Sequence, residues 1–157
     1  RRLGVPVVLD GEKSETRIMV DLVPRVDHAI FSVTGLQNFA PGTTPEEGLR
    51  RALASGPVKL AAVTRGEKGT LWLAPRMAAP QEIPAFKVEA TNTTGAGDVF
   101  HGAYALAIAE GMGLEAALRF ASADESAANA TPDRAAQASP IDKTQGLTWL
   151  KASCILL

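Results

Sequence analysis

Apolar runs separated by polar turns divide the first part of the chain into alternating strands and helices. Three runs are short and almost wholly apolar, a pattern that predicts buried strands at residues 3–10, 28–32 and 59–64. A helical pattern follows the first run, with Ser14 as its predicted N-cap and Pro24 at its end. A second helix is predicted from Thr44 to Gly56, because a capping box with proline at the first helical position opens it. This alternation predicts an α/β fold with a parallel sheet.

The pattern changes after residue 64. A glycine-containing turn at 65–69 and a second apolar run at 70–74 predict a β-hairpin. The proline-rich stretch that follows predicts a surface connection, with short strands at 81–83 and 87–90. Two helices rich in alanine, leucine and isoleucine are predicted from Asp98 to Glu110 and from Leu114 to Asn129, and we expect both to pack on the sheet.

Composition narrows the class of protein. The chain has 157 residues, 46% of them hydrophobic and 21% charged, which predicts one globular domain over residues 1–157. The net charge of −1 gives no expectation of a nucleic-acid or membrane partner, and no apolar run reaches the roughly 20 residues of a membrane span. One cysteine and two histidines exclude a disulfide scaffold and a Cys/His zinc site, so no metal ligands are assigned. Without a signal peptide the expected location is the cytoplasm, and the opening Arg1 suggests a piece of a longer protein.

The residues before the first of these two helices predict an anion site. Gly95, Ala96 and Gly97 allow several backbone N–H groups to converge, and the positive end of the helix dipole adds to their field. Thr94 can donate its hydroxyl to the same anion. Asp98 has two interpretations: a general base for a hydroxyl that accepts a phosphoryl group, or a carboxylate that only complements the helix N-terminus.

Two familiar nucleotide motifs are absent. The glycines at 95 and 97 do not form a dinucleotide fingerprint, because Phe100 stands where the third glycine is required. Residues 66–70 lack the Gly-Lys-Thr order of a phosphate loop. A Rossmann dehydrogenase is therefore the least favoured interpretation.

Residues 92–104, Asn-Thr-Thr-Gly-Ala-Gly-Asp-Val-Phe-His-Gly-Ala-Tyr, closely resemble the second signature of the ribokinase-like carbohydrate kinases, also called the phosphofructokinase B type. Residues 63–69 and 116–123 resemble that family's nucleotide turn and the helix beside the adenine. The resemblance runs from about Val5 to Ala128, always to the C-terminal half of the family's fold. It implies a three-layer α/β/α fold with a mostly parallel sheet, lacking the N-terminal half with its sugar-binding motif and small β lid.

The resemblance also implies an activity and a set of roles. The intact enzyme would phosphorylate a hydroxyl of a sugar, with Asp98 as the base and the amides of Gly95, Ala96 and Gly97 as the anion hole. ATP is the implied nucleotide, with Mg²⁺ held mainly by its phosphates and by water. The residues implied to line the nucleotide are Thr64, Gly66, Gly69, Thr94 and Ser122. A homodimer is expected if the lid is present.

The chain departs from the family pattern at several places. Asn92 replaces an aspartate that in many members helps to hold a monovalent cation, which argues against potassium activation. Thr34–Gln37 offers no carboxylate where the family's Asn-x-x-Glu places Mg²⁺, and Asp124 and Glu125 stand at usually small apolar positions. Two alternatives follow: a non-catalytic nucleotide- or anion-binding module, and a nucleoside kinase of the same superfamily.

Four other polar or aromatic side chains have two interpretations each. His101 is expected to be a partly buried structural histidine rather than a phosphate ligand. Asp10, at a strand end, either faces a ligand or caps the following turn. Trp72 is expected to be a half-buried hairpin aromatic rather than a platform for a base, and Arg65 to solvate its turn rather than bind phosphate.

Overall fold

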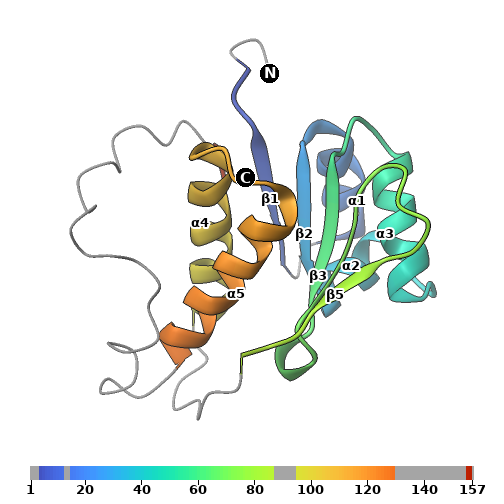
Figure 1. Ribbon diagram of the computed structural model, residues 1–157. Coiled ribbons are helices and arrows are strands. Elements are labelled where there is room, and N and C mark those ends of the chain that lie inside the picture. Colours follow the sequence, from blue (N-terminus) through green and yellow to red (C-terminus); the bar gives the residue numbers. More distant parts are fainter. Residues whose placement is uncertain (1–3, 13–14, 87–94, 130–154, 157) are drawn as a thin grey trace.

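The computed structural model describes residues 4–12, 15–86, 95–129 and 155–156. A six-stranded sheet lies between two layers of helices (Figure 1), and its strand order is β5-β4-β3-β2-β1-β6. The strands are β1 (Val7–Gly11), β2 (His28–Ser32), β3 (Leu60–Thr64), β4 (Thr70–Leu73), β5 (Gln81–Ile83) and β6 (Ile155–Leu156). Strands β6, β1, β2 and β3 are parallel neighbours, whereas β4 is antiparallel to both β3 and β5. The predicted α/β class with a mostly parallel sheet is confirmed.

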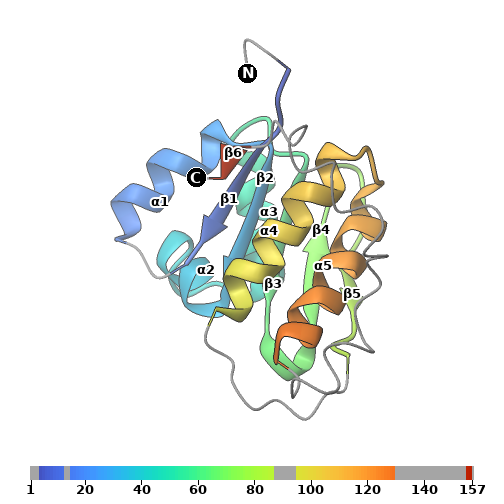
Figure 2. The same ribbon diagram turned by 90° about the vertical axis from the view of Figure 1, so that its left-hand side faces the viewer.

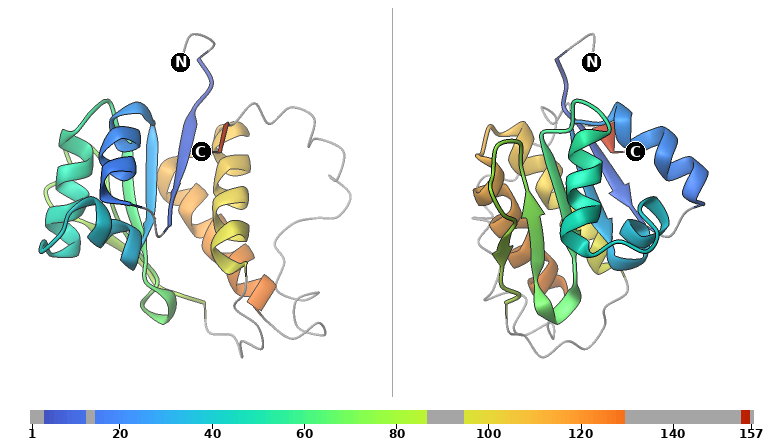
Figure 3. Two further views of the ribbon diagram at one scale, coloured as in Figure 1. Left: turned by 180° about the vertical axis from the view of Figure 1, so that it is seen from behind. Right: turned by 90° about the vertical axis from the view of Figure 1, so that its right-hand side faces the viewer.

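The helices divide between the two faces of this sheet. Figure 3 shows one face covered by α1 (Thr16–Leu22), α2 (Val33–Phe39) and α3 (Pro45–Ala54). Figure 2 shows the other covered by α4 (Ala96–Ala109) and α5 (Leu114–Asn129). Short 3₁₀ turns, η1 (Val23–Arg25) and η2 (Gly66–Lys68), follow α1 and β3.

Side chains alternate along each central strand between two separate apolar clusters. In β2, Ala29 and Phe31 pack with the α1–α3 layer, and Ile30 between them packs with α4 and α5. In β1, Leu9 joins the first cluster and Val8 the second. Strands apolar on both faces are typical of parallel sheets covered by helices, which is why these runs could be located from the sequence.

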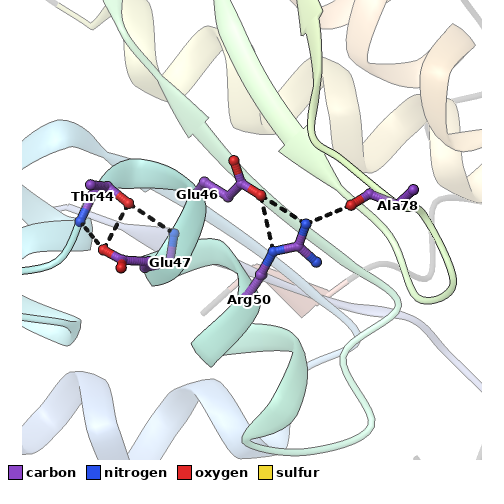
Figure 4. Close-up of polar contacts among 5 residues, drawn as sticks. All are labelled: Thr44, Glu46, Glu47, Arg50 and Ala78. Carbon is purple, nitrogen blue, oxygen red and sulfur yellow. Dashed lines mark hydrogen bonds and ion pairs between the residues drawn. The ribbon is translucent and has the colours of Figure 1, made fainter.

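The start of α3 shows the predicted capping box in full (Figure 4). The Thr44 hydroxyl accepts from the Glu47 amide at 3.3 Å, and the Glu47 carboxylate accepts from the Thr44 amide at 2.8 Å. One turn further, Arg50 donates both to Glu46 and to the Ala78 carbonyl. These contacts fix the start of α3 and tie it to the loop after β4.

The structure differs from the sequence prediction in three places. Helix α2 was not predicted: its β-branched first residue and internal glycine favour other structures, but the Ser32 hydroxyl accepts from the Gly35 amide at 3.0 Å and caps it. The N-cap of α1 is Glu15, without a side-chain cap bond, and the proposed cap Ser14 lies outside the described residues. Strand β6 was also unpredicted, while the strand expected at 87–90 lies outside the described part.

No helix in the described part of the chain is long and apolar enough to cross a membrane.

Candidate functional site

Helix α4 lies on the sheet with its first turn at the carboxyl ends of the parallel strands (Figure 2). Two contacts with β2 fix this direction: Tyr104 hydrogen-bonds His28 at the start of the strand, and His101, one turn earlier in the helix, faces the Ile30 carbonyl. The helix therefore runs opposite to β2. In open α/β sheets ligands bind at the carboxyl edge of the strands.

The predicted anion site forms the beginning of α4. Gly95 is its N-cap, in a left-handed conformation with φ +82°, and no side chain caps the helix there. The first turn closes through the Val99 amide, which donates to the Gly95 carbonyl at 3.0 Å. The first amides of a helix have no partner within the helix, so those of Gly95, Ala96 and Gly97 can serve an anion. Asp98, in the same turn, is exposed to solvent.

Carboxylates from the end of β1 lie beside this turn. A Cβ on Gly97 would lie 3.4 Å from Glu12 Oε1, which places that side chain directly against the helix start. Burial raises the pKa of Asp10, and the charges of Glu12 and Asp98 raise it further, while His101 opposes them. Glu12 and Asp98 are therefore near enough for their charges to act on Asp10.

His101 is buried, with 1% of its surface exposed, and bonded within the protein. Its Nδ1 donates to the Gly97 carbonyl at 2.7 Å, and its Nε2 lies 3.4 Å from both the Ile30 carbonyl and Asp10 Oδ1. The expected structural role is confirmed, and the burial is more complete than expected. Its pairing with Asp10 was missed, because residues so distant in sequence meet only once the helix is placed on the sheet.

The residues implied to line the nucleotide start at the same edge of the sheet. Thr64 ends β3 and lies opposite Ser32 at the end of β2, with its hydroxyl 3.4 Å from the Phe31 carbonyl. In the following turn Gly66 has φ +57° and open space around its Cα. Gly69 has a structural reason for being glycine, because its φ is +72° and a Cβ there would overlap the Ile83 carbonyl.

Arg65 in this turn is occupied by the protein itself. Its guanidinium pairs with Glu82 of β5 at 2.9 Å and donates to the Lys68 carbonyl at 3.1 Å. The expectation that it only solvates the turn was wrong, because the side chain is mostly buried and links the hairpin to β5.

Four further residues were singled out in the sequence, and the structure describes two of them, Ser122 and Trp72. Ser122 on α5 is buried, and its hydroxyl has no hydrogen-bond partner among the described residues. Trp72 is buried in the cluster beneath α4 and α5, deeper than the half-buried position expected. Thr94 and Asn92 lie outside the described part of the chain.

A family profile for the pfkB family carbohydrate kinase matches residues 1–141. The chain belongs to this family. Among curated relatives, a ribokinase of Bacillus subtilis is 44% identical over 98 residues, which cover 61% of this chain and 31% of the relative. A ribokinase of Arabidopsis thaliana is 36% identical over 129 residues, covering 78% of this chain and 34% of the relative.

Solved structures of pfkB-type kinases share the fold. A putative ribokinase from Agrobacterium tumefaciens superposes with a TM-score of 0.76 at 33% identity, covering 82% of this chain and 42% of that one. The Arabidopsis thaliana ribokinase complexed with ribose and ATP gives a TM-score of 0.69 at 31% identity, again over 82% and 42%. The ribokinase-like fold class is thus confirmed, and the chain spans about a third of the length of the curated relatives it matches.

Proposed function

We propose that this chain is the nucleotide-binding part of a sugar kinase, which transfers the γ-phosphoryl group of ATP to a sugar hydroxyl. The observation that carries the proposal is the solvent-accessible Asp98 in the first turn of α4, directly after Gly95–Gly97, where no side chain caps the helix. The similarity to ribokinases, one of them solved with ribose and ATP, supports a sugar as the acceptor.

In this proposal Asp98 and the glycine turn would have complementary tasks. Asp98 would accept the proton of the acceptor hydroxyl as its oxygen bonds to the γ-phosphorus, and the bond from that phosphorus to the β–γ bridging oxygen breaks. The Gly95, Ala96 and Gly97 amides would stabilise the negative charge on the phosphoryl oxygens.

Mg²⁺ would fit this site when it is bound together with the nucleotide phosphates. The described residues contain no group of three or more side chains that could hold a metal alone. Mg²⁺ typically uses one or two carboxylates together with phosphates and water, and Asp10 and Glu12 offer carboxylates beside the helix start. When bound, the ion would neutralise charge on the phosphates.

The nucleotide would extend from this turn toward β3 and α5. Thr64 and Gly66 lie at the carboxyl end of β3, with Gly69 shaping the turn. The buried Ser122 hydroxyl on α5 has no hydrogen-bond partner among the described residues. Because buried hydroxyls are rarely left without a partner, this supports a hydrogen bond from Ser122 to the nucleotide. Thr94 completes the proposed set next to the anion site.

We expect turnover to depend on segments that precede Arg1, so the test compares Asp98→Asn with the parent in the longer gene product, following ADP release over a panel of sugars and ATP binding by calorimetry. We expect ATP binding to be retained and turnover to fall by about 100-fold or more, since a general base contributes 10²–10⁴-fold. Glu110→Gln, an exposed carboxylate at the other end of the same helix, is the matched control and should change neither. Equal turnover of the Asp98→Asn variant and the parent would show that the assigned role is wrong.

A non-catalytic nucleotide-binding module is the second candidate. Residues Thr34–Gln37 fall in the first turns of α2 and provide no carboxylate, and the Gln37 amide is used to bond the Thr43 carbonyl. ATP binding without ADP release for any sugar, in this chain and in a longer gene product, would favour this candidate.

A further inference from the structure

His101 connects the start of α4 to both of the strands beneath it. Within its own helix it donates to the Gly97 carbonyl at 2.7 Å. Its other ring nitrogen lies 3.4 Å from the Ile30 carbonyl of β2 and 3.4 Å from the Asp10 carboxylate at the end of β1. A single side chain thus links the Gly95–Asp98 turn to two strands of the sheet.

The first turn of α4 has little side-chain packing of its own. Gly95 and Gly97 have no side chains, Asp98 and Val99 are exposed, and no side chain caps the helix. The first fully buried side chains of the helix are those of Phe100 and His101. Phe100 contributes apolar packing on the cluster beneath the helix, whereas His101 reaches back by hydrogen bond to the turn.

The surroundings of the His101 ring consist of acceptors. The Gly97 and Ile30 carbonyls can only accept hydrogen bonds, so a ring N–H is the group that bonds to them, and the Asp10 carboxylate lies beside the second nitrogen. Asp10 Oδ1 is buried and has no other hydrogen-bond partner among the described residues. The charged groups that face this centre are Asp10 from β1, with Glu12 and Asp98 beside it, and Glu125 from α5.

We propose that His101 is a positioning residue: it holds the first turn of α4 against Asp10 and Ile30, and thereby fixes the Gly95–Gly97 amides and Asp98. The inference rests on the proposed function for the meaning of that turn. It goes beyond it by assigning the order of the turn to a side chain that touches neither the nucleotide nor the sugar. The structural contacts can be tested without any kinase activity.

Amide hydrogen exchange followed by NMR on this chain provides the test, because exchange reports local opening residue by residue. In His101→Leu, which has a similar size and no donor, we expect the Val99 and Phe100 amides to exchange about tenfold faster. The reference amide is that of Ala117, which closes the first turn of α5 on the Gly113 carbonyl and should change little. Asp10→Asn removes the charge on the other side of the contact and should accelerate the same two amides severalfold.

Two further variants separate positioning from packing. Tyr104→Phe removes a buried hydrogen bond from the same helix one turn later, and it should leave the Val99 amide as protected as the parent relative to Ala117. His101→Gln, which keeps an amide donor, should restore most of the protection lost in the leucine variant. Unchanged exchange at Val99 in His101→Leu, an equal rise throughout α4 and α5, or equal loss in the leucine and glutamine variants would each overturn the proposal. If the leucine variant does not fold, the glutamine and Asp10→Asn variants decide by the same comparison.

The experiments distinguish a failure of the proposed kinase function from a failure of the proposed role of His101. Asp98→Asn should leave the exchange pattern of the first turn intact while removing phosphoryl transfer. If Asp98→Asn keeps full turnover, the assigned function is wrong whatever the exchange data show. If Asp98→Asn behaves as expected but His101→Leu keeps the parental exchange and ATP affinity, only the positioning role is wrong.

Discussion

Helix α4 is attached to β2 by two buried histidine contacts that differ in their chemistry. His28 is 4% exposed and His101 is 1% exposed. His28 hydrogen-bonds the Tyr104 hydroxyl at 2.7 Å, and burial lowers its pKa to about 4, so its ring is neutral. His101 instead faces two carbonyls and a carboxylate. The same residue type thus serves a neutral contact within the core and a polar contact beneath the candidate site.

The two edges of the sheet differ in the same way. At the amino edge Asp27 accepts from the Val7 amide at 3.1 Å and pairs with Lys59 at 3.3 Å, while its carbonyl accepts from the Lys59 amide. These bonds join the starts of β1, β2 and β3. At the carboxyl edge Asp10 Oδ1 faces only the His101 ring within the described structure, and Asp98 is accessible to solvent. The polar groups at the amino edge thus bond one strand to another, whereas the carboxyl edge carries an exposed carboxylate, Asp98.

The largest expected effect on stability comes from adding a side chain where the backbones of α2 and β1 touch at the carboxyl edge of the sheet. A Cβ on Gly35 of α2 would overlap the Gly11 carbonyl at the end of β1. Because backbone must move to relieve this overlap, Gly35→Ala should lower the free energy of unfolding by about 3 kcal/mol or more, measured by urea denaturation.

Gly102→Ala is the matched control for that substitution. Gly102 lies in α4 and is exposed, and a methyl group added there would have no other atom within 4 Å. Alanine there should raise the free energy of unfolding by up to about 1 kcal/mol through helix propensity. Similar losses in both variants would show that the contact between α2 and β1 does not exist as described.

The next largest effect is the pH dependence of stability that comes from His28. The ordinary pKa of histidine is 6.5 and that of His28 in the folded protein is about 4, so the unfolded chain binds more protons between these values. The contribution of His28 is fully present above pH 6.5 and is lost as pH falls toward 4. From pH 7 to pH 5 we expect a loss of about 2 kcal/mol in the free energy of unfolding, measured by urea denaturation at each pH.

His28→Gln should remove this part of the pH dependence while leaving the contribution of the carboxylates. The loss would then be smaller by the same amount between pH 7 and 5. An unchanged slope would mean that His28 is not held neutral in the folded chain, and the contrast with His101 would disappear.

Much of this arrangement could be predicted from local sequence signals. The capping box at Thr44, the buried strands and the glycine turn before α4 each depend on neighbouring residues, and the structure confirms them. Helix α2 could not be predicted in this way, because its only strong local signal is the Ser32 cap and it is otherwise held by packing against α1, α3 and β2.

The candidate site shows the same limit. The sequence indicated Gly95–Asp98 as a unit because the motif is contiguous. The neighbouring carboxylates Asp10 and Glu12, and the contact of His101 with Asp10, depend on how α4 crosses the sheet. No pattern in the chain specifies that placement, and the roles of all these residues in catalysis remain predictions.

A moderate effect is expected where the neutral histidine loses its partner. Tyr104→Phe leaves the His28 Nδ1 buried without its hydroxyl, which should cost about 1–2 kcal/mol in the free energy of unfolding, measured by urea denaturation. ATP affinity should not change, because the contact lies toward the amino edge of the sheet. A loss of affinity larger than the loss of stability would mean that the two attachments of α4 act together rather than separately.

The smallest expected effect is a gain in the free energy of unfolding, and it tests the interaction between His101 and Glu125. Burial raises the pKa of Glu125, and His101 opposes that rise. The contribution of Glu125 to stability is therefore fully present only below its ordinary pKa of 4.5, and it is lost as pH increases through the raised pKa. Glu125→Gln should therefore raise the free energy of unfolding at pH 7 by less than about 1 kcal/mol and change nothing at pH 4, measured by thermal denaturation. In a His101→Leu background the side chain that opposes the rise in the pKa of Glu125 is absent, so the gain at pH 7 should be larger. Equal gains in both backgrounds would show that Glu125 and His101 do not interact, and the comparison of the two histidines would then rest on their hydrogen-bond partners alone.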